Sequence, residues 1–308
     1  DLGFNYSYLV AASLNMPPYV YVENDKVINQ PTHTSVSKRP ENPYAFWIKG
    51  AISEDFIHDE VLPVFVNKTI SFINQNANNE SPFFIYLPLP APHNPILPID
   101  PWKGKSKISP YADFVLMIDD LMGKIFEAIK ENGIEENTLV IFTSDNGCAP
   151  SANFSVLKSK GHNPNYIYNG HKGSYLEGGH RVPFLVKWPK QIEANTVSDA
   201  TICTTDFMAT CAEIVDYQVK DNEAEDSFSI MPLLTNKGNY IREATIHHSK
   251  EGVFAIRKGD WKLTNAKENH WKSEPTDFYI APIIDNKELK LFNINKDAGE
   301  RVDLAAKH

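Results

Sequence analysis

The segment NTLVIFTSDNG, residues 137–147, joins a short apolar run to a polar ending. Its apolar part, residues 138–144, has the pattern of a buried strand. Two further runs share this character, FFIYLPL at 83–89 and VPFLVKW at 182–188. We therefore predict three short strands that are buried in a sheet.

Three other segments predict helices. Apolar spacing indicates one over 55–76, with a stripe at Ile57, Val61, Phe65, Thr69 and Ile73. A second begins at Ser109 and Pro110, which are typical of an N-cap and a first turn, and ends at Gly133. Its expected stripe is Val115, Ile118, Met122, Ile125 and Ile129. A third covers 206–215. This alternation predicts an α/β fold with a mostly parallel sheet flanked by helices.

The two ends of the chain differ from this middle part. Residues 1–50 are rich in Pro, Asn and aromatics, which favours a long ordered loop with short extended pieces. Beyond residue 235, short strand-like runs are joined by turns, which indicates a small antiparallel sheet. We expect a catalytic α/β domain over 1–235 and an antiparallel subdomain over 236–308.

Composition narrows the class of protein. A chain of 308 residues can bury a sizeable core, and its formal net charge of −9 argues against nucleic acid as a partner. No apolar run approaches the ~20 residues of a membrane helix. Three cysteines without metal-ligand spacing exclude a disulfide framework and a cysteine-based zinc site.

Polar residues follow two of the expected strands, where ligands bind in open α/β sheets. His93 lies in the loop after 83–89, and Asp145 and Asn146 follow 138–144. A carboxylate beside an amide suits Ca²⁺ or Mg²⁺, since both cations prefer oxygen ligands. Asp-Asn-Gly is also strong turn chemistry, and these residues alone leave both interpretations open.

The block GHKGSYLEGGHRVPFLVKWP, residues 170–189, favours a ligand site. Glycines at 170, 173, 178 and 179 would let the backbone approach a ligand closely. Lys172 among them supplies a compact positive charge that can bind a tetrahedral oxyanion. A single lysine in a glycine-rich loop is otherwise usually solvated.

This block, with APHNP (91–95), NTLVIFTSDNG (137–147), AIRKGDWKL (255–263) and LFNINKDAGERVDL (291–304), resembles the sulfatases. These are formylglycine-dependent sulfuric ester hydrolases of the alkaline phosphatase superfamily. The resemblance covers most of the chain in the family's order. It implies an alkaline-phosphatase-like α/β fold with a small C-terminal antiparallel sheet.

The resemblance also implies roles for single residues. Asp145 and Asn146 would be two ligands of a Ca²⁺ ion, with Mg²⁺ as the alternative. Lys172 would bind a sulfate oxygen. His93 would hydrogen-bond the ester and protonate the departing alcohol, a role suited to imidazole. His162 and His171 are weaker candidates for the substrate pocket, Arg181 is expected in a buried ion pair, and His247 and His248 at the surface.

The segment CAPSA (148–152), which begins with Cys148, resembles the C/S-x-P-x-R motif from which sulfatases make formylglycine. Ala152 replaces the required arginine, so we interpret Cys148 as an ordinary thiol near the site rim. No other copy of the motif occurs in the sequence. We therefore expect the nucleophile in a missing upstream segment, and this chain to be an inactive carboxyl-terminal portion.

The leading hypothesis is a sulfatase acting on a sulfated carbohydrate or aryl sulfate outside the cytosol, in an extracellular, periplasmic or lysosomal compartment. One alternative is a phosphodiesterase or phosphonate hydrolase of the same superfamily. Asn146 argues against it, since zinc-dependent relatives tend to carry histidine there. Another alternative is a non-catalytic sulfatase-like protein that binds glycans.

Overall fold

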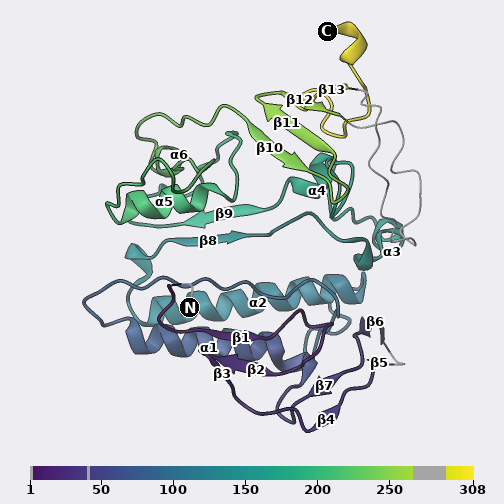
Figure 1. Cartoon of the computed structure of the whole chain (residues 1–308), viewed down its shortest axis with the longest axis vertical. Helices are drawn as coiled ribbons and strands as arrows, with labels where there is room; N and C mark the ends of the chain where they lie inside the picture. The colour runs from purple at the N-terminus through teal and green to yellow at the C-terminus, as the bar shows by residue number, and fades with distance from the viewer. Residues whose placement is uncertain (1–2, 40–41, 266–288) are drawn as a thin grey trace. The chain divides into compact units, whose positions relative to one another are not determined.

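The computed structural model describes residues 3–39, 42–265 and 289–308, and the chain forms two compact units (Figure 1). Unit 1 comprises Asp1–Glu135 and Ser151–His162, and unit 2 comprises Glu136–Pro150 and Asn163–His308. The domain boundary expected at residue 235 lies inside unit 2 and stays a prediction.

Unit 1 combines short antiparallel strands with two long helices. Strand β1 (Tyr8–Val10) pairs with β2 (Tyr21–Glu23), which pairs with β3 (Lys26–Val27). Two small ladders follow, β4 (His33–Thr34) with β7 (Ala51–Ile52) and β5 (Lys38–Arg39) with β6 (Asn42–Phe46). The expectation of an ordered loop with short extended pieces is therefore confirmed.

The remaining elements of unit 1 are helical. They are η1 (His58–Glu60), α1 (Val61–Asn76), α2 (Pro110–Glu131) and α3 (Phe154–Ser159). Short 3-10 turns η2 (Glu135–Asn137) and η3 (Pro150–Ala152) lie where the chain passes between units. Helices α1 and α2 contact each other, and their buried side chains join those of β2 in one apolar core.

Both long helices were predicted from the sequence, with small differences. The Ser109 side chain accepts a hydrogen bond from the Ala112 N–H, as expected of an N-cap. Helix α1 begins only at Val61, so Ile57 lies outside it and is 44% exposed. In α2 the buried stripe is rotated from the expected one, because Phe114 is buried and Val115 is exposed.

The prediction of a strand at 83–89 is wrong. This segment has no ladder partner among the described residues, and its side chains alternate between half-buried and exposed. Phe84 and Tyr86 are 65% and 68% exposed, whereas Phe83 contacts the Phe72 ring of α1. An apolar run indicates that a segment tends to be buried, but it does not indicate whether a neighbouring strand is present to pair with it.

Unit 2 contains a two-stranded ladder and a four-stranded sheet. Strands β8 (Val140–Thr143) and β9 (Phe184–Lys187) form the first. The second has the order β10 (Thr245–His248), β11 (Phe254–Lys258), β12 (Trp261–Thr264) and β13 (Lys290–Asn293). Its helices are α4 (Glu177–His180), α5 (Asp206–Ile214), α6 (Met231–Thr235) and η4 (Ala305–Lys307).

The α/β class and the C-terminal antiparallel sheet are confirmed, and the third predicted helix is α5. The strand directions differ from the expectation. Every described ladder is antiparallel, and the one described parallel pairing is the isolated bridge between Tyr19 and Ile52. Phe142 and Leu185 are also 40% and 64% exposed, so β8 and β9 are not buried on both faces.

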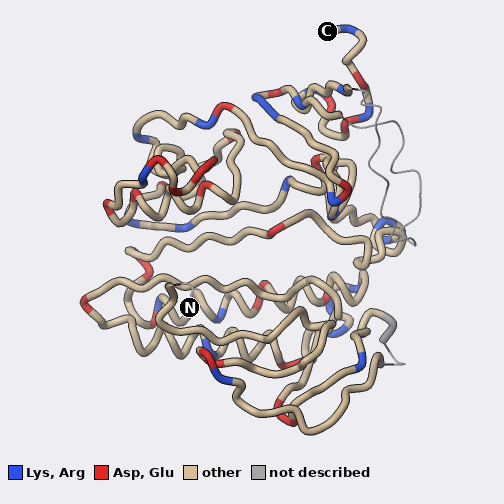
Figure 2. The backbone as a smooth tube through the Cα atoms, viewed as in Figure 1, with Lys and Arg blue, Asp and Glu red and all other residues tan. Residues whose placement is uncertain are grey.

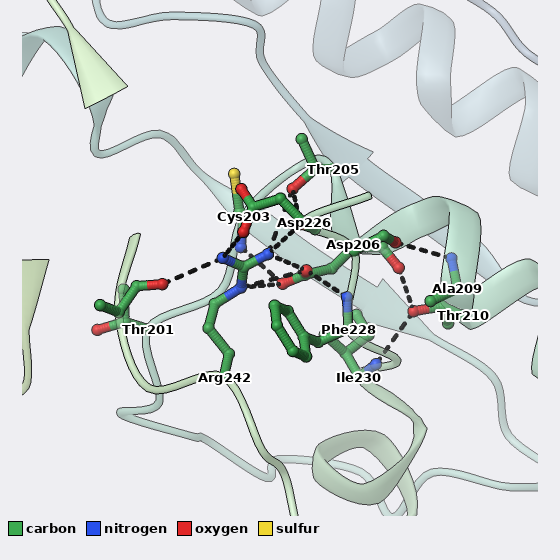
Figure 3. A network of polar contacts seen from close by, with 12 residues as sticks. Thr201, Cys203, Thr205, Asp206, Ala209, Thr210, Asp226, Phe228, Ile230 and Arg242 are labelled. Atoms are coloured by element: carbon green, nitrogen blue, oxygen red, sulfur yellow. Dashed lines mark hydrogen bonds and ion pairs between the residues drawn. The ribbon is translucent and has the colours of Figure 1, made fainter. Parts of the chain in front are cut away.

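A buried ion pair fixes the segment around α5 (Figure 3). The Arg242 guanidinium contacts Asp206 at 2.6 Å and Asp226 at 3.1 Å, and the side chains of Arg242 and Asp206 are each 1% exposed. Asp206 also accepts hydrogen bonds from the N–H groups of Cys203 and Phe228. Arg242 therefore ties the start of α5 to the chain that enters β10.

The described helices contain no stretch that is both long and apolar enough to span a bilayer. Acidic and basic positions are interspersed along both units (Figure 2).

We predict that Arg242→Ala lowers the free energy of unfolding of unit 2 by about 3–5 kcal/mol, because it leaves the Asp206 carboxylate buried without its cation. Urea denaturation of the chain measures this. Lys258→Ala is the matched control, since Lys258 pairs with Glu243 at the surface and should matter little. Equal midpoints for the two variants would contradict the prediction.

Candidate functional site

The candidate site forms at one end of the β8–β9 ladder. Thr143, the last residue of β8, lies opposite Phe184, the first residue of β9. The chain therefore leaves β8 and enters β9 at the same end. This antiparallel register brings the residues after β8, Asp145 and Asn146, beside the glycine-rich block that precedes β9.

Backbone hydrogen bonds join these two segments. The Gly147 N–H donates to the Gly179 carbonyl at 3.0 Å, and the Lys172 N–H donates to the Cys148 carbonyl at 3.0 Å. Asn165 adds a bridge, because its Oδ1 accepts from the Cys148 N–H at 3.3 Å. We call residues 145–148 and 170–179, held by these bonds, the paired loops.

The glycines of the paired loops allow backbone to pack on backbone. A Cβ at Gly147 would lie 1.8 Å from the Gly178 carbonyl oxygen. A Cβ at Gly178 would lie 2.6 Å from the carbonyl oxygens of Asn169 and Gly170, and one at Gly179 would lie 2.3 Å from that of Ser174. The expectation that Gly178 and Gly179 make room for a ligand is therefore corrected, because protein backbone occupies that space.

Asp145 and Asn146 present oxygen atoms from this fixed backbone. The Asn146 amide nitrogen donates to an Asp145 carboxylate oxygen at 3.1 Å, and the Ser144 hydroxyl lies 3.4 Å from the same oxygen. The amide uses its nitrogen here, so its oxygen is the atom suited to a cation. Asp145 is exposed and Asn146 is half-buried.

Lys172 is half-buried, between His171 and Gly173. The His171 Nδ1 lies 2.9 Å from the Lys172 carbonyl oxygen. Burial lowers the pKa of His171, which favours its neutral form. His171 is thus fixed on the same loop as Lys172.

The other two predicted histidines lie in unit 1. His93 is half-buried, and its Nδ1 lies 2.6 Å from the Asn94 carbonyl oxygen. His162 is exposed three residues after the end of α3, and its N–H donates to the Leu157 carbonyl. The structure therefore brings Asp145, Asn146 and Lys172 together, while the proximity of His93 and His162 to them stays a prediction.

The sequence analysis missed a buried charge cluster that includes Glu177 of the paired loops. The Lys262 side chain is 0% exposed and contacts Glu177 at 3.2 Å and Glu300 at 2.8 Å. Glu177 also pairs with Arg257 at 3.0 Å, and its N–H donates to Glu300. The cluster joins α4, within the glycine-rich block, to strands β11 and β12. The only available signal was charged residues inside the family-like segments.

The two carboxylates respond differently to this environment. Burial would raise the pKa of Glu177, but Lys262 and Arg257 outweigh it, so this pKa lies below its usual value. Burial raises the pKa of Glu300, and Lys262 offsets only part of the effect. Glu177 is therefore the better-stabilised anion of the pair.

Arg181 differs from its expected role. Its side chain is 44% exposed and lies 3.5 Å from Glu177, with the guanidinium 4.6 Å from the Tyr168 ring centroid. The buried cation of Glu177 is Lys262 instead. Lys262 lies 85 residues after Glu177 in the sequence, so spacing alone could not predict this contact.

His247 also differs from expectation, because it faces the paired loops while His248 is exposed. Its Nε2 lies 3.1 Å from the Tyr175 carbonyl oxygen, and its ring centroid lies 4.2 Å from that of His180. Burial, with the nearby charge of Lys262, lowers the pKa of His247 to about 3. Burial also lowers the pKa of His180, so two neutral imidazoles pack against each other.

Cys148 contributes to the paired loops through its backbone, as described above. Its side chain is half-buried, with Sγ 3.7 Å from the Ala149 carbonyl oxygen. The short turn η3 follows directly.

The donor set suits a hard cation but is incomplete. Among the described residues, no group of three or more His, Cys, Asp or Glu side chains could hold a metal. Asp145 and Asn146 would supply two oxygens, whereas Ca²⁺ takes about 6–8. The chemistry of these two residues fits calcium or magnesium, and other ligands would have to complete the shell.

Comparison with known proteins identifies the family. A family model described as Sulfatase matches residues 12–217. N-acetylgalactosamine-6-O-sulfatase of Bacteroides thetaiotaomicron is 27% identical over 351 aligned positions, covering 100% of this chain and 66% of that protein. Human N-acetylgalactosamine-6-sulfatase is 28% identical, covering 79% of this chain and 48% of its own length.

Solved structures agree in fold. A Bacteroides thetaiotaomicron structure from work on the metabolism of multiple glycosaminoglycans superposes with a TM-score of 0.82 at 25% identity, covering 99% of this chain and 70% of that chain. The structure of Ps i-CgsB with k-i-k-neocarrahexaose has a TM-score of 0.67 at 25% identity, covering 94% and 54%.

The chain belongs to the sulfatase family, as the resemblance predicted. It spans between about half and two thirds of the length of these two relatives.

We predict that Gly147→Ala separates the paired loops, because the new methyl group would collide with the Gly178 carbonyl. The free energy of unfolding should fall by about 1–3 kcal/mol. Gly123→Ala in α2 is the matched control, since it meets nothing within 4 Å and should stabilise the helix by roughly 1 kcal/mol. Urea denaturation compares them, and an equally stable Gly147→Ala variant would refute the prediction.

Proposed function

We propose that the protein to which this chain belongs hydrolyses sulfate esters of carbohydrates. The observation that supports the proposal is the position of Asp145, Asn146 and Lys172 on loops joined by backbone hydrogen bonds, in a chain of the sulfatase family. A carboxylate, an amide and an ammonium held on one rigid backbone are suited to a bound anion and its counter-cation.

The candidate substrate is N-acetylgalactosamine 6-sulfate or a sugar closely related to it. Support comes from two relatives whose names specify this ester, one of them aligned over the whole chain. An extracellular, periplasmic or lysosomal location would suit such an enzyme, since sulfated glycans occur outside the cytosol.

The chain's own residues would act mainly by binding and orienting the ester. Asp145 and Asn146 would hold a Ca²⁺ or Mg²⁺ ion, which when bound offsets negative charge on the sulfate. Lys172 would contact a sulfate oxygen and keep this charge balanced as the ester bond breaks. His93 would donate a hydrogen bond to the ester oxygen and a proton to the departing alcohol.

In this proposal, the nucleophile that attacks the sulfate ester is not one of these residues. We expect a formylglycine from a C/S-x-P-x-R motif elsewhere in the whole protein. Cys148 is unsuited to that role, since Ala152 stands in the arginine position and the Cys148 backbone is committed to the paired loops.

We predict that Lys172→Ala in the full-length protein lowers kcat/KM for N-acetylgalactosamine 6-sulfate by about 100- to 1,000-fold, the effect of removing one group that stabilises developing charge. Sulfate release measured by ion chromatography gives the rates. Lys190→Ala is the control, because Lys190 is an exposed lysine shortly after β9.

Two results would count against the proposal. One is a Lys172→Ala variant that keeps the native rate. The other is a native protein that cleaves the matching phosphate ester faster than the sulfate ester, which would favour the phosphodiesterase alternative.

A further inference from the structure

Three Asn-Gly pairs occur in the chain, at residues 132–133, 146–147 and 169–170. Asparagine before glycine is prone to lose its side-chain amide, because the glycine nitrogen attacks the asparagine Cγ atom and no glycine side chain hinders the approach. A glycine nitrogen that donates a backbone hydrogen bond must first be released from it. The hydrogen bonds of the three glycines therefore determine which pair reacts in the folded protein.

The pair at 132–133 is held by the end of α2. The Gly133 N–H donates to the Lys130 carbonyl at 2.9 Å, so this nitrogen is engaged in the backbone. The side-chain amide that would leave is engaged as well, since the Asn132 nitrogen donates to Asn74 Oδ1 at 2.7 Å and to the Ala128 carbonyl at 2.8 Å. Both partners of the reaction are thus restrained.

The pair at 146–147 is held by the paired loops. The Gly147 N–H donates to the Gly179 carbonyl at 3.0 Å. The Asn146 amide nitrogen donates to Asp145 Oδ1 at 3.1 Å. The reaction at Asn146 therefore requires the paired loops to separate first.

The pair at 169–170 has the opposite arrangement. The Gly170 N–H donates to Oδ1 of Asn169 itself at 2.9 Å, and no other hydrogen bond engages this N–H within the described part of the chain. The contact places the attacking nitrogen beside the Cγ atom that carries this oxygen. Asn169 is exposed, and its amide nitrogen donates to none of the residues that the structure describes, so ammonia can leave into water.

We propose that Asn169 is a site of spontaneous deamidation, which converts it to aspartate and isoaspartate while Asn132 and Asn146 stay intact. Hydroxide removes the proton of the Gly170 nitrogen, which then forms a bond to Asn169 Cγ. The Cγ–Nδ2 bond breaks, and Nδ2 takes a proton from water and leaves as ammonia. Water finally opens the cyclic imide at either of its carbonyls, which gives aspartate or isoaspartate. The proposal is independent of the proposed function.

The product changes the chain at the start of the glycine-rich block. The Asn169 carbonyl oxygen accepts a hydrogen bond from the Gly178 N–H at 2.7 Å. In isoaspartate the main chain runs through Cγ, so this carbonyl becomes part of a side-chain carboxylate and an extra carbon atom precedes Gly170. Aspartate adds the charge but keeps the main chain as it is. Isoaspartate therefore weakens the contact with Gly178, and aspartate retains it.

The test incubates the folded full-length protein at mildly alkaline pH, because hydroxide starts the reaction. Digestion at acidic pH and mass spectrometry then measure the loss of amide at each Asn-Gly pair. We expect Asn169 to react about 10-fold or more faster than Asn132 and Asn146, since the glycine after each of these must first lose a hydrogen bond. Protein unfolded in guanidinium chloride is the control, and there the three rates should become similar.

Asn169→Gln is the matched variant, because glutamine would have to close a larger ring. It should abolish the reaction at this position and leave the rates at Asn132 and Asn146 unchanged. Equal rates at the three positions of the folded protein would overturn the proposal. So would an intact Asn169 in folded protein after a time that converts it in the unfolded control.

Amide hydrogen exchange tests the effect on the glycine-rich block. The Gly178 amide should exchange about 10-fold or more faster in the isoaspartate fraction than in the native protein, because its acceptor is displaced. Asn169→Asp is the control that carries the charge without the extra carbon atom, and it should keep the native exchange rate. Native exchange of Gly178 in the isoaspartate fraction would overturn the inferred weakening of this contact.

Discussion

The antiparallel register of β8 and β9 is the constraint on which the candidate site depends. Because Thr143 lies opposite Phe184, the long segment between these strands begins and ends at the same end of the ladder. The Gly147–Gly179 and Lys172–Cys148 hydrogen bonds then fix its two ends to each other. A parallel pairing would instead send Asp145 and the glycine-rich block to opposite ends of the ladder.

Buried ion pairs connect further segments of unit 2. Lys262 ties β12 to Glu177 of α4, and Arg242 ties the chain before β10 to Asp206 of α5. Each cation is almost wholly removed from water, so its attraction to the carboxylate is strong but compensates a large desolvation cost. Such pairs specify which segments belong together, and here they connect the C-terminal sheet to the paired loops that carry Lys172.

Part of the fold and of the candidate site could be predicted from the sequence, and the rest could not, for physical reasons. The N-cap of α2 at Ser109, the helix α5 and the C-terminal sheet follow from local patterns, which act within a few residues. The direction of β9 and the missing strand at 83–89 depend on partners far along the chain. The same holds for Lys262, because its burial beside Glu177 and Glu300 cannot be predicted from the spacing of residues. Asp145, Asn146 and Lys172 were found because each lies in a family-like segment.

Amide hydrogen exchange of the chain, followed by NMR, tests the central claim most directly. The claim is that backbone hydrogen bonds lock Asp145 and Asn146 beside Lys172. It predicts that the amides of Gly147, Lys172 and Gly178 exchange as slowly as those within β8 and β9. Gly147 and Lys172 each donate to a carbonyl of the facing loop, and Gly178 donates to the carbonyl of Asn169, just before its own loop. Exchange of the Gly147 and Lys172 amides at the rate of an unfolded peptide, while β8 and β9 stay protected, would contradict it.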